Sequence, residues 1–289
     1  MAKAPKELIE ESLDVLATCI HCEERASPDS HTVVKVTGAD RQEVPEALAC
    51  YAVAFLAGWV EQDATIASRL ALQGVEKRPE VVKLVDRIAT PEPNLNAEQL
   101  ENWKQTSRNA WIAEVFTHAL FVIHRTRTSD FLQGGVLALL RPHPLPKRQG
   151  LDSVAIFGEE GIAVMTFGET KASADNASAQ LTNACGMFDN IEEGLHGPDI
   201  RNAIDVLGAL LPDPMKTQVT ESLWRKNRCY LPAIFHQSAF IPSDSRVRLA
   251  ALEPVAARKR VVVCQIADFE AFFGAVATAM PTVISELVV

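Results

Sequence analysis

The stretch from Gly150 to Ala172 restricts the fold of this chain more than any other, because it has the pattern of a β-hairpin. Two apolar runs rich in β-branched residues, 154–157 and 162–167, lie on either side of four turn-forming residues, Gly-Glu-Glu-Gly at 158–161. Strands joined by so short a loop pair with each other in antiparallel fashion. The sequence therefore predicts a hairpin whose loop centres on Glu160 and Gly161.

Charged residues gather at the open end of this hairpin. A loop centred in this way places Asp152 of the first strand beside Glu169 of the second. Lys171 shares a strand face with Glu169, because side chains alternate along a strand. Glu169-Thr170-Lys171 is the only Asp/Glu-x-Lys triplet in the chain. The alternative explanation is a salt bridge between Glu169 and Lys171 on an edge strand, with Asp152 as a turn former.

Two neighbouring carboxylates and a lysine are what a metal-dependent phosphodiesterase needs. Carboxylate oxygens bind Mg²⁺, which keeps several of its waters. The metal polarises the scissile phosphate and lowers the pKa of a bound water, while the lysine orients that water or neutralises developing charge. Without a metal, Asp152 and Glu169 would repel each other and their pKa values would rise. The hairpin end is therefore a candidate site for phosphodiester hydrolysis.

The segments around the hairpin predict a sheet covered by helices. An apolar helix is expected at 107–124, with Glu114 inside its apolar surround, and a basic loop at 141–149 leads into the hairpin. Small and apolar residues at helical spacing from 172 to 190 predict a helix after it, capped by Asp175. Further elements are expected at 199–211 (helix), 230–240 and 260–266 (strands) and 269–280 (helix). This order is that of a mixed α/β sheet with helices on both faces.

The first hundred residues are predicted to form a mainly helical region. Its expected elements are helices at 6–20 and 79–89, a helix or helix pair at 45–74 with a weak point at Gly58–Trp59, and a short strand at 32–37. The connector at 90–96, which contains two prolines and two asparagines, is the expected domain boundary. We therefore expect a helical region at 1–100 that can dock a partner, followed by a catalytic core at 101–289.

The chain resembles the PD-(D/E)xK, or restriction-endonuclease-like, nuclease superfamily in three places: Glu114 in a helix, Gly150-Leu151-Asp152 opening a hairpin, and Gly168-Glu169-Thr170-Lys171 closing it. More narrowly, GLDSVAIF and MTFGETKASADN, followed by a helix of small residues, resemble the HamA nuclease subunits of Hachiman anti-phage defence systems. The resemblance covers residues 107–190 well and 260–280 loosely. It departs from the superfamily pattern at Leu151, near which a proline is expected.

This resemblance implies a role for each matching residue. Glu114, Asp152 and Glu169 correspond to ligands of Mg²⁺ or Mn²⁺, with the carbonyl of Thr170 as a further ligand, and Lys171 corresponds to the catalytic lysine. Gln180 lies where some members carry a functional glutamine, but Ala184 stands where their tyrosine is expected. A helix-surface role for Gln180 therefore competes with a functional one.

Family membership implies DNA as the substrate and a helicase as the partner. The net charge of −9 argues against a protein that coats nucleic acid through its own positive field. An acidic nuclease that receives DNA from a helicase fits this charge. Local basic clusters occur at Arg125 and Arg127, at Arg141 with Lys147 and Arg148, at 225–228 and at 258–260. The competing hypothesis is a non-catalytic interaction subunit that keeps the nuclease fold.

The remaining features bear on compartment and metal content. The longest uncharged apolar run, 47–60, has 14 residues, fewer than the roughly 20 that span a bilayer. No secretory signal is apparent at the N-terminus, so we expect a cytoplasmic protein without a membrane anchor. Among six cysteines only Cys19 and Cys22 form a close pair. A zinc site would need a second such pair, so ordinary cysteines at a helix end compete with a zinc or redox site.

Overall fold

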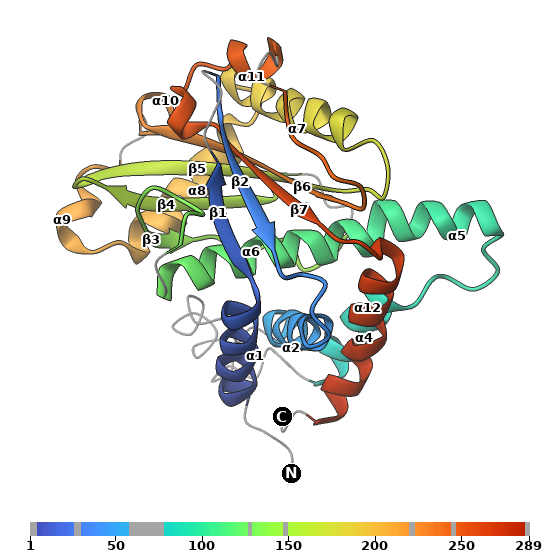
Figure 1. Cartoon of the computed structure of the whole chain (residues 1–289). Helices are drawn as coiled ribbons and strands as arrows, with labels where there is room; N and C mark the ends of the chain where they lie inside the picture. Colours follow the sequence, from blue (N-terminus) through green and yellow to red (C-terminus); the bar gives the residue numbers. More distant parts are fainter. Residues whose placement is uncertain are drawn as a thin grey trace.

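A seven-stranded mixed β-sheet covered by helices organises the chain (Figure 1). The computed structural model describes residues 5–25, 30–57, 78–126, 129–146, 150–219, 223–243 and 247–286. The strands are β1 (His21–Arg25), β2 (Thr32–Thr37), β3 (Gly135–Leu139), β4 (Ser153–Glu159), β5 (Ile162–Ala172), β6 (Arg228–His236) and β7 (Arg260–Gln265).

The longer helices are α1 (Pro5–Cys19), α2 (Val44–Leu56), α4 (Arg78–Ala89), α5 (Ala97–Trp103), α6 (Ala110–Thr126), α7 (Ala177–Glu192), α8 (Gly197–Leu210) and α12 (Phe269–Glu286). Short helical segments are η1 (Lys104–Asn109), α9 (Asp213–Lys216), α10 (Leu223–Lys226), α11 (Val247–Ala251) and η2 (Ala256–Arg258). None of these described helices combines the length and apolar content that crossing a membrane requires.

The strands lie in the order β1-β2-β7-β6-β5-β4-β3. The inner strands β2, β7, β6 and β5 run parallel to one another, so their carboxyl ends share one edge of the sheet. β1 is antiparallel at one side, and the hairpin β4–β5 together with β3 supplies the antiparallel pairs at the other. β5 is consequently an interior strand, with β6 on one side and β4 on the other.

Apolar side chains on both sheet faces hold the two helical layers. On one face, Phe116 of α6 lies 5.4 Å from Phe235 of β6 and 6.2 Å from Phe272 of α12, between ring centroids. On the other, Phe188 of α7 stacks on Tyr230 of β6 at 4.5 Å. Figure 1 shows α1, α2, α4 and α12 gathered on one side of the sheet and α7 and α11 on the other. The predicted mixed α/β sheet with helices on both faces is confirmed.

The first hundred residues belong to the same core as the rest of the described chain. β2 pairs in parallel with β7, and α2 packs against α12. The expected boundary at residue 100 therefore does not separate two cores, and the region 1–100 contributes two strands as well as helices. β1 was not predicted, because His-Cys-Glu-Glu-Arg has no apolar alternation and gains its strand structure from backbone pairing with β2.

Two local expectations need correction or fall outside the described ranges. The N-cap of α7 is Asn176, with φ 59°, rather than Asp175. Asp175 instead accepts a hydrogen bond at its carbonyl from the Ser173 hydroxyl, at 2.5 Å. α2 begins where the long apolar helix was predicted, but the continuation from residue 58 to 74, with the weak point at Gly58–Trp59, lies outside the described residues.

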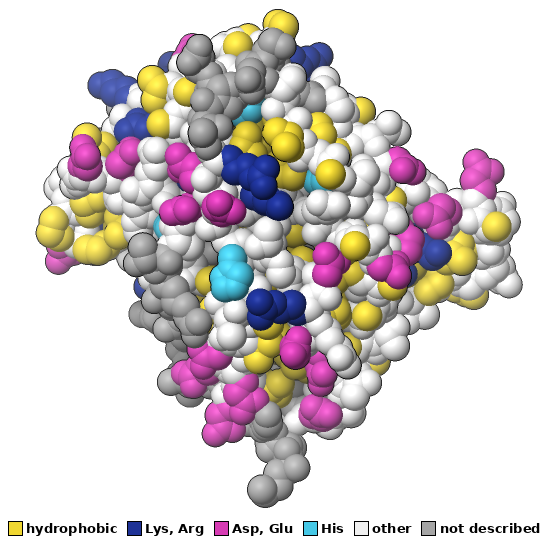
Figure 2. Space-filling model, in the orientation of Figure 1, with side chains coloured by type: hydrophobic (Ala, Val, Ile, Leu, Met, Phe, Trp, Pro, Cys, Tyr) yellow, Lys and Arg dark blue, Asp and Glu magenta, His cyan; other side chains and the backbone are white. Residues whose placement is uncertain are grey.

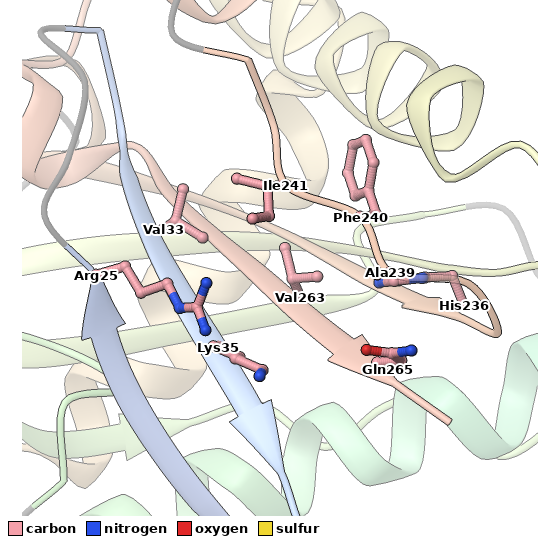
Figure 3. A pocket seen from close by; sticks show the side chains of 9 residues that line it. All are labelled: Arg25, Val33, Lys35, His236, Ala239, Phe240, Ile241, Val263 and Gln265. Carbon is pink, nitrogen blue, oxygen red and sulfur yellow. The ribbon is translucent and has the colours of Figure 1, made fainter. Parts of the chain in front are cut away.

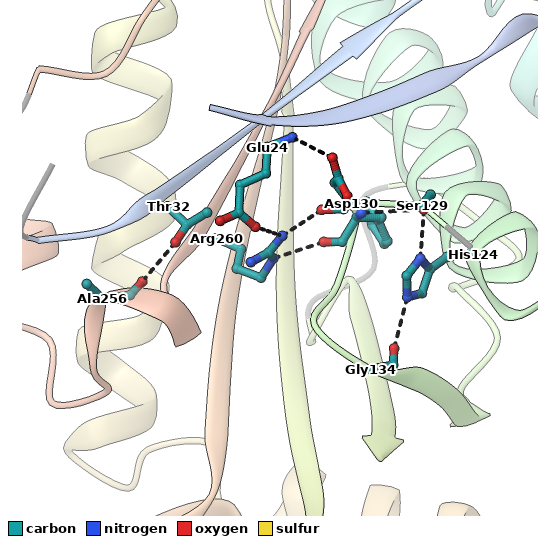
Figure 4. Close-up of polar contacts among 9 residues, drawn as sticks. Glu24, Thr32, His124, Ser129, Asp130, Gly134, Ala256 and Arg260 are labelled. Carbon is teal, nitrogen blue, oxygen red and sulfur yellow. Dashed lines mark hydrogen bonds and ion pairs between the residues drawn. The ribbon is translucent and has the colours of Figure 1, made fainter. Parts of the chain in front are cut away.

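A buried arginine ties the start of β7 to the segment before β3 (Figure 4). The side chain of Arg260 is 1% exposed, and its Nε donates to the carbonyl of Phe131 at 3.0 Å. Its Nη2 donates to Glu24 of β1 at 2.9 Å and to the carbonyl of Asp130 at 2.6 Å. The backbone N–H of Glu24 also donates to the Asp130 carboxylate at 3.2 Å. Arg260 thereby joins the N-terminal strands to the half of the chain that carries the hairpin.

Candidate active site

The hairpin β4–β5 forms in the predicted register. At its open end Ser153 pairs with Gly168, the partner expected for a loop centred on Glu160 and Gly161. Those two loop residues have φ values of 49° and 83°. Positive φ at both central positions gives the tight turn whose twist matches that of the strands. The register therefore carries the acidic residues of the two strands to the same end.

Asp152 bridges the two strands just beyond the last pair of the hairpin. Its Oδ2 accepts a hydrogen bond from the backbone N–H of Thr170 at 2.8 Å. This bond runs to the neighbouring strand and not within the local segment of Asp152. Asp152 therefore fixes the approach of the two strands and does not act as a simple turn former.

Glu169 and Lys171 form an ion pair on the interior strand β5. The Nζ of Lys171 lies 2.5 Å from Oε1 of Glu169, and Lys171 is 30% exposed whereas the Glu169 side chain is 6% exposed. The second oxygen, Oε2 of Glu169, is buried and has no hydrogen-bond partner among the residues that the structure describes. The salt bridge of the alternative explanation therefore forms, but its edge-strand position is wrong, because β5 lies between β4 and β6. Lys171 therefore contacts only one of the two oxygens of this buried carboxylate.

Glu114 reaches this end of the sheet from α6. Thr117 lies one turn further along the helix, and its hydroxyl oxygen accepts a hydrogen bond from the Thr170 hydroxyl at 3.1 Å. That contact holds α6 against β5. Burial raises the pKa of Glu114 well above its usual value, the charges of Asp152 and Glu169 raise it further, and Lys171 partly opposes them. The structure thus brings all four predicted charged residues into one electrostatic cluster.

The cluster contains more negative than positive charge. Burial, and then the charge of Glu169, raise the pKa of Asp152 to about 7, although the Thr170 N–H opposes this. Burial acts to lower the pKa of Lys171, but the attraction of Glu169, Asp152 and Glu114 outweighs it and the pKa is raised. Lys171 therefore keeps its positive charge. This single charge cannot neutralise all three carboxylates of the cluster.

A cavity of about 190 Å³ opens beside Asp152. Arg141, His143 and Asp199 line it together with Asp152. The indole N–H of Trp111 in α6 donates to the carbonyl of His143 at 2.9 Å, which positions the loop. Arg141 was predicted only as part of a basic loop, whose other cations Lys147 and Arg148 lie outside the described residues. The sequence does not single out His143, because no other histidine lies at metal-ligand spacing from it.

The donor set suits a hard divalent cation. Asp152, Glu169 and the carbonyl of Thr170 offer oxygen ligands, and the partnerless Oε2 of Glu169 is an acceptor that a cation would satisfy. Within the described ranges no three His, Cys, Asp or Glu side chains are grouped to hold a metal ion. The fit therefore depends on the carboxylates of Asp152 and Glu169 and on the main-chain carbonyl of Thr170, while Glu114 adds to the negative electrostatic field. So small a set of protein ligands suits Mg²⁺, which keeps several waters.

The other basic clusters lie at the start of β6 and β7, away from the carboxyl ends of these strands. Arg228 is 6% exposed and forms ion pairs with Glu192, at 3.1 Å, and with Glu253. Arg258 pairs with Glu159 at 2.9 Å. These arginines serve internal ion pairs. Of the cluster at 125–127, Arg127 lies outside the described residues.

The remaining sequence candidates do not join the cluster. Cys19 ends α1 and Cys22 lies in β1, so the two cysteines are not a pair at one helix end. Burial raises the pKa of Cys22 to about 12, which opposes the thiolate that a zinc or redox site uses. Gln180 is half-buried on α7.

No protein-family model matches the chain, and no curated protein matches it significantly. The functional inference therefore rests on the residues described above.

Proposed function

We propose that the chain is a metal-dependent DNA nuclease of the PD-(D/E)xK type, the effector of a Hachiman-like anti-phage defence system acting in the cytoplasm. The observation that carries the proposal is the cluster at the open end of β4–β5. Asp152, Glu169 and Lys171 lie together there, Asp152 lines a cavity, and one buried oxygen of Glu169 has no partner among the described residues. Strongly perturbed pKa values cluster at functional sites, where burial and like charges are brought together.

The residues divide the hydrolytic work by their chemistry. Asp152, Glu169 and the Thr170 carbonyl would hold Mg²⁺ or Mn²⁺, with Glu114 close enough to add charge or a water contact. A bound divalent cation would polarise the scissile phosphate and acidify a water. Lys171, with its raised pKa, stays protonated at neutral pH and so neutralises charge developing on the phosphate and orients the attacking water. Arg141, across the cavity from this group, would bind a phosphate oxygen.

Partner delivery of the substrate follows from charge. The chain carries a net charge of −9, so DNA does not accumulate on it through long-range attraction. A helicase that feeds a strand to the cavity would remove this difficulty. The partner proposal is tested by co-purification of the chain with a helicase encoded beside its gene. If the two proteins do not associate, the defence-system assignment fails while the nuclease assignment stands.

The nuclease proposal is tested by cleavage of plasmid and linear DNA in Mg²⁺. We expect cleavage by the wild type, its loss in excess EDTA, and a fall of about 10²- to 10³-fold in Lys171→Ala. Lys216→Ala is the matched control, because Lys216 also pairs with a carboxylate, that of Asp213 at 2.7 Å, but on the exposed surface. Cleavage that persists in Lys171→Ala or in EDTA would refute the proposal.

A second candidate is a catalytically inert subunit that keeps the fold and docks a partner. One observation favours it: the described residues contain no ready group of three metal-binding side chains, and Lys171 already occupies one oxygen of Glu169. Titration calorimetry with Mg²⁺ and Mn²⁺ separates the candidates. A nuclease should bind metal in a manner that Asp152→Asn weakens, whereas an inert subunit should give no heat that depends on Asp152.

A further inference from the structure

A second polar pocket lies on the sheet some distance from the hairpin (Figure 3). Its volume is about 90 Å³. We call it the edge pocket and define it by six lining residues: Arg25 of β1, Lys35 of β2, His236 of β6, Gln265 of β7, and Phe240 and Ile241 of the segment after β6. It thus combines cations, a histidine, an amide and apolar side chains in one place.

The two cations of the edge pocket are not neutralised by any contact within the described part of the chain. Neither Arg25 nor Lys35 makes a side-chain hydrogen bond or an ion pair with any residue that the structure describes. Glu23 stands directly opposite Lys35 in the β1–β2 register, yet the two form no ion pair. Figure 3 shows the charged ends of Arg25 and Lys35 on the same side of the sheet. Two adjacent cations without an ion-pair partner among the described residues, on a protein of net charge −9, suit an anion.

His236 gives the pocket a neutral hydrogen-bonding edge. The residue is 1% exposed, and among the described residues neither ring nitrogen has a partner within hydrogen-bond geometry, although the main chain of Ser238 is near. Burial lowers the pKa of the ring, partly opposed by the nearby main chain of Ser238. A neutral imidazole offers one donor and one acceptor, and an unsatisfied buried group of this kind calls for a partner.

Apolar side chains stand beside this polar edge. Phe240 meets the His236 ring edge-on, with centroids 5.7 Å apart. Ile241 is 67% exposed, which is unusual for a large apolar side chain. Figure 2 shows lysine and arginine side chains in the middle of this molecular face, bordered by an apolar patch and by acidic side chains. A planar ligand with a charged group and hydrogen-bonding edges suits such a surface, as a nucleotide does.

The edge pocket shares a sheet face with the candidate active site. The register aligns Lys171 with Ile234, Ile234 with Val263, and Val263 with Lys35. Aligned residues on neighbouring strands point to the same face, so Lys171 and Lys35 stand on one row, three strand spacings or about 14 Å apart. That span corresponds to about four nucleotides at the rise of ~3.4 Å per nucleotide in a DNA strand.

We propose that the edge pocket binds one nucleotide of the DNA strand that is cleaved at Lys171. Arg25 and Lys35 hold its phosphate, Phe240 and Ile241 contact the base, and the His236 and Gln265 side chains reach the hydrogen-bonding edge of the base. The identity of the ligand rests on the proposed nuclease function. The pocket holds the strand several nucleotides from the scissile bond and so sets the direction in which it leaves the candidate active site.

The test measures binding of a fluorescently labelled short oligothymidylate to the full chain by anisotropy, in EDTA so that no cleavage occurs. We expect the double variant Arg25→Ala/Lys35→Ala to weaken binding about tenfold and to lower the salt slope by about 0.7, the value for one lost phosphate contact on a single strand. Phe240→Ala should weaken it about tenfold through lost stacking. Glu23→Gln should strengthen it, because it removes a repulsive charge. Thermal unfolding verifies that each variant is folded.

The matched control is Lys83→Ala/Arg87→Ala, which removes two exposed cations from α4. An equal loss of affinity in this control would refute the edge pocket, because general charge would then explain the binding. Unchanged affinity in Arg25→Ala/Lys35→Ala would refute it as well. Inorganic phosphate serves as a competitor: if it displaces the oligonucleotide and Phe240→Ala has no effect, the pocket holds a phosphate only and the nucleotide proposal is wrong.

Cleavage assays on the same variants separate this inference from the nuclease proposal. If the wild type cleaves DNA and the edge-pocket variants change neither binding nor cleavage, the pocket is refuted and the nuclease stands. If binding depends on Arg25 and Lys35 but no metal-dependent cleavage occurs, the pocket is supported and the nuclease is refuted.

Discussion

The chain contains two buried charged clusters that differ in how far positive and negative charges balance. Arg260 is one cation whose Nε and Nη2 donate to three oxygen acceptors, the Glu24 carboxylate and the carbonyls of Phe131 and Asp130, while its buried Nη1 has no hydrogen-bond partner among the described residues. At the open end of the hairpin, three carboxylates surround one lysine, and Oε2 of Glu169 has no partner. Both clusters are mostly buried, so burial alone does not separate a structural cluster from a functional one.

The difference lies in charge balance. The Arg260 cluster approaches neutrality through one carboxylate and two carbonyl dipoles, and such a group contributes to stability when its partners are in place. In the hairpin cluster, burial first and then the charges of neighbouring carboxylates raise the pKa of Glu114 and of Asp152. Under the proposed function, a bound cation would relieve this repulsion. Each prediction below challenges this contrast.

The largest effect is expected from Glu169→Gln. The substitution keeps the shape of the side chain but removes the charge that would bind metal and pair with Lys171. We expect DNA cleavage in Mg²⁺ to fall by about 10³-fold or more, with a native circular dichroism spectrum. A variant that cleaves as fast as the wild type would place the hairpin cluster in the structural class with Arg260.

Arg260→Met should act on stability and not on cleavage. The methionine fills part of the space but leaves the carbonyls of Phe131 and Asp130 without their donor. We expect the free energy of unfolding in urea to fall by about 2–4 kcal/mol. Cleavage per folded molecule should stay within about twofold of the wild type. A stable variant without activity would contradict the structural role of Arg260.

Asp152→Asn should stabilise the metal-free protein in a pH-dependent manner. The pKa of Asp152 is raised from 3.8 to about 7 in the folded state. The contribution of Asp152 to stability is therefore largest below pH 3.8, where its carboxyl is protonated in both the folded and the unfolded state. This contribution is lost as the pH rises through about 7. Asparagine carries no such penalty. The variant should be more stable than the wild type at pH 8 by about 1–3 kcal/mol, with little difference near pH 4.

The same urea titrations in Mg²⁺ provide the control for this prediction. Metal that binds the folded wild type should stabilise it and remove the advantage of Asp152→Asn. If the variant is no more stable than the wild type at pH 8 without metal, the carboxylates do not repel one another as described.

The smallest effect is expected from Thr117→Val. This nearly isosteric change removes the hydrogen bond between α6 and Thr170 on β5. We expect a loss of about 1 kcal/mol in unfolding free energy. Because the bond holds the helix that carries Glu114, cleavage should also fall, by severalfold. Stability loss without any change in cleavage would show that α6 does not position the site.

The hairpin could be predicted from sequence because its information is local. The loop Glu160-Gly161 fixes the register, and the register alone brings Asp152, Glu169 and Lys171 together. Glu114 was also identified, although its distance in sequence from the hairpin meant that only its resemblance to a known pattern singled it out. Asp152, Glu169 and Lys171 are thus brought together by strand pairing within one segment of the chain.

Other features depend on partners far away in the chain and could not be predicted. β1 is a strand only because β2 lies beside it, and Arg260, which the sequence showed as one cation of a basic run, is buried by the segment around Asp130. His143 and Arg141 reach the cavity because Trp111 holds their loop. Asp175 and Asn176 are both acceptable caps by type, and only the backbone geometry selects Asn176.

The position of β7 has a consequence for the order of folding. β7 joins β2, made early in the chain, to β6, made late, and of the described strands it is the last to be synthesised. Until residues 260–265 are available, β1 and β2 have no route into the sheet, whereas β3, β4, β5 and β6 can already pair. Such distant pairings raise the contact order, and high contact order slows folding. Completion of the sheet therefore waits for β7, and the growing chain carries an open edge on β6 and another on β2 until this strand closes both.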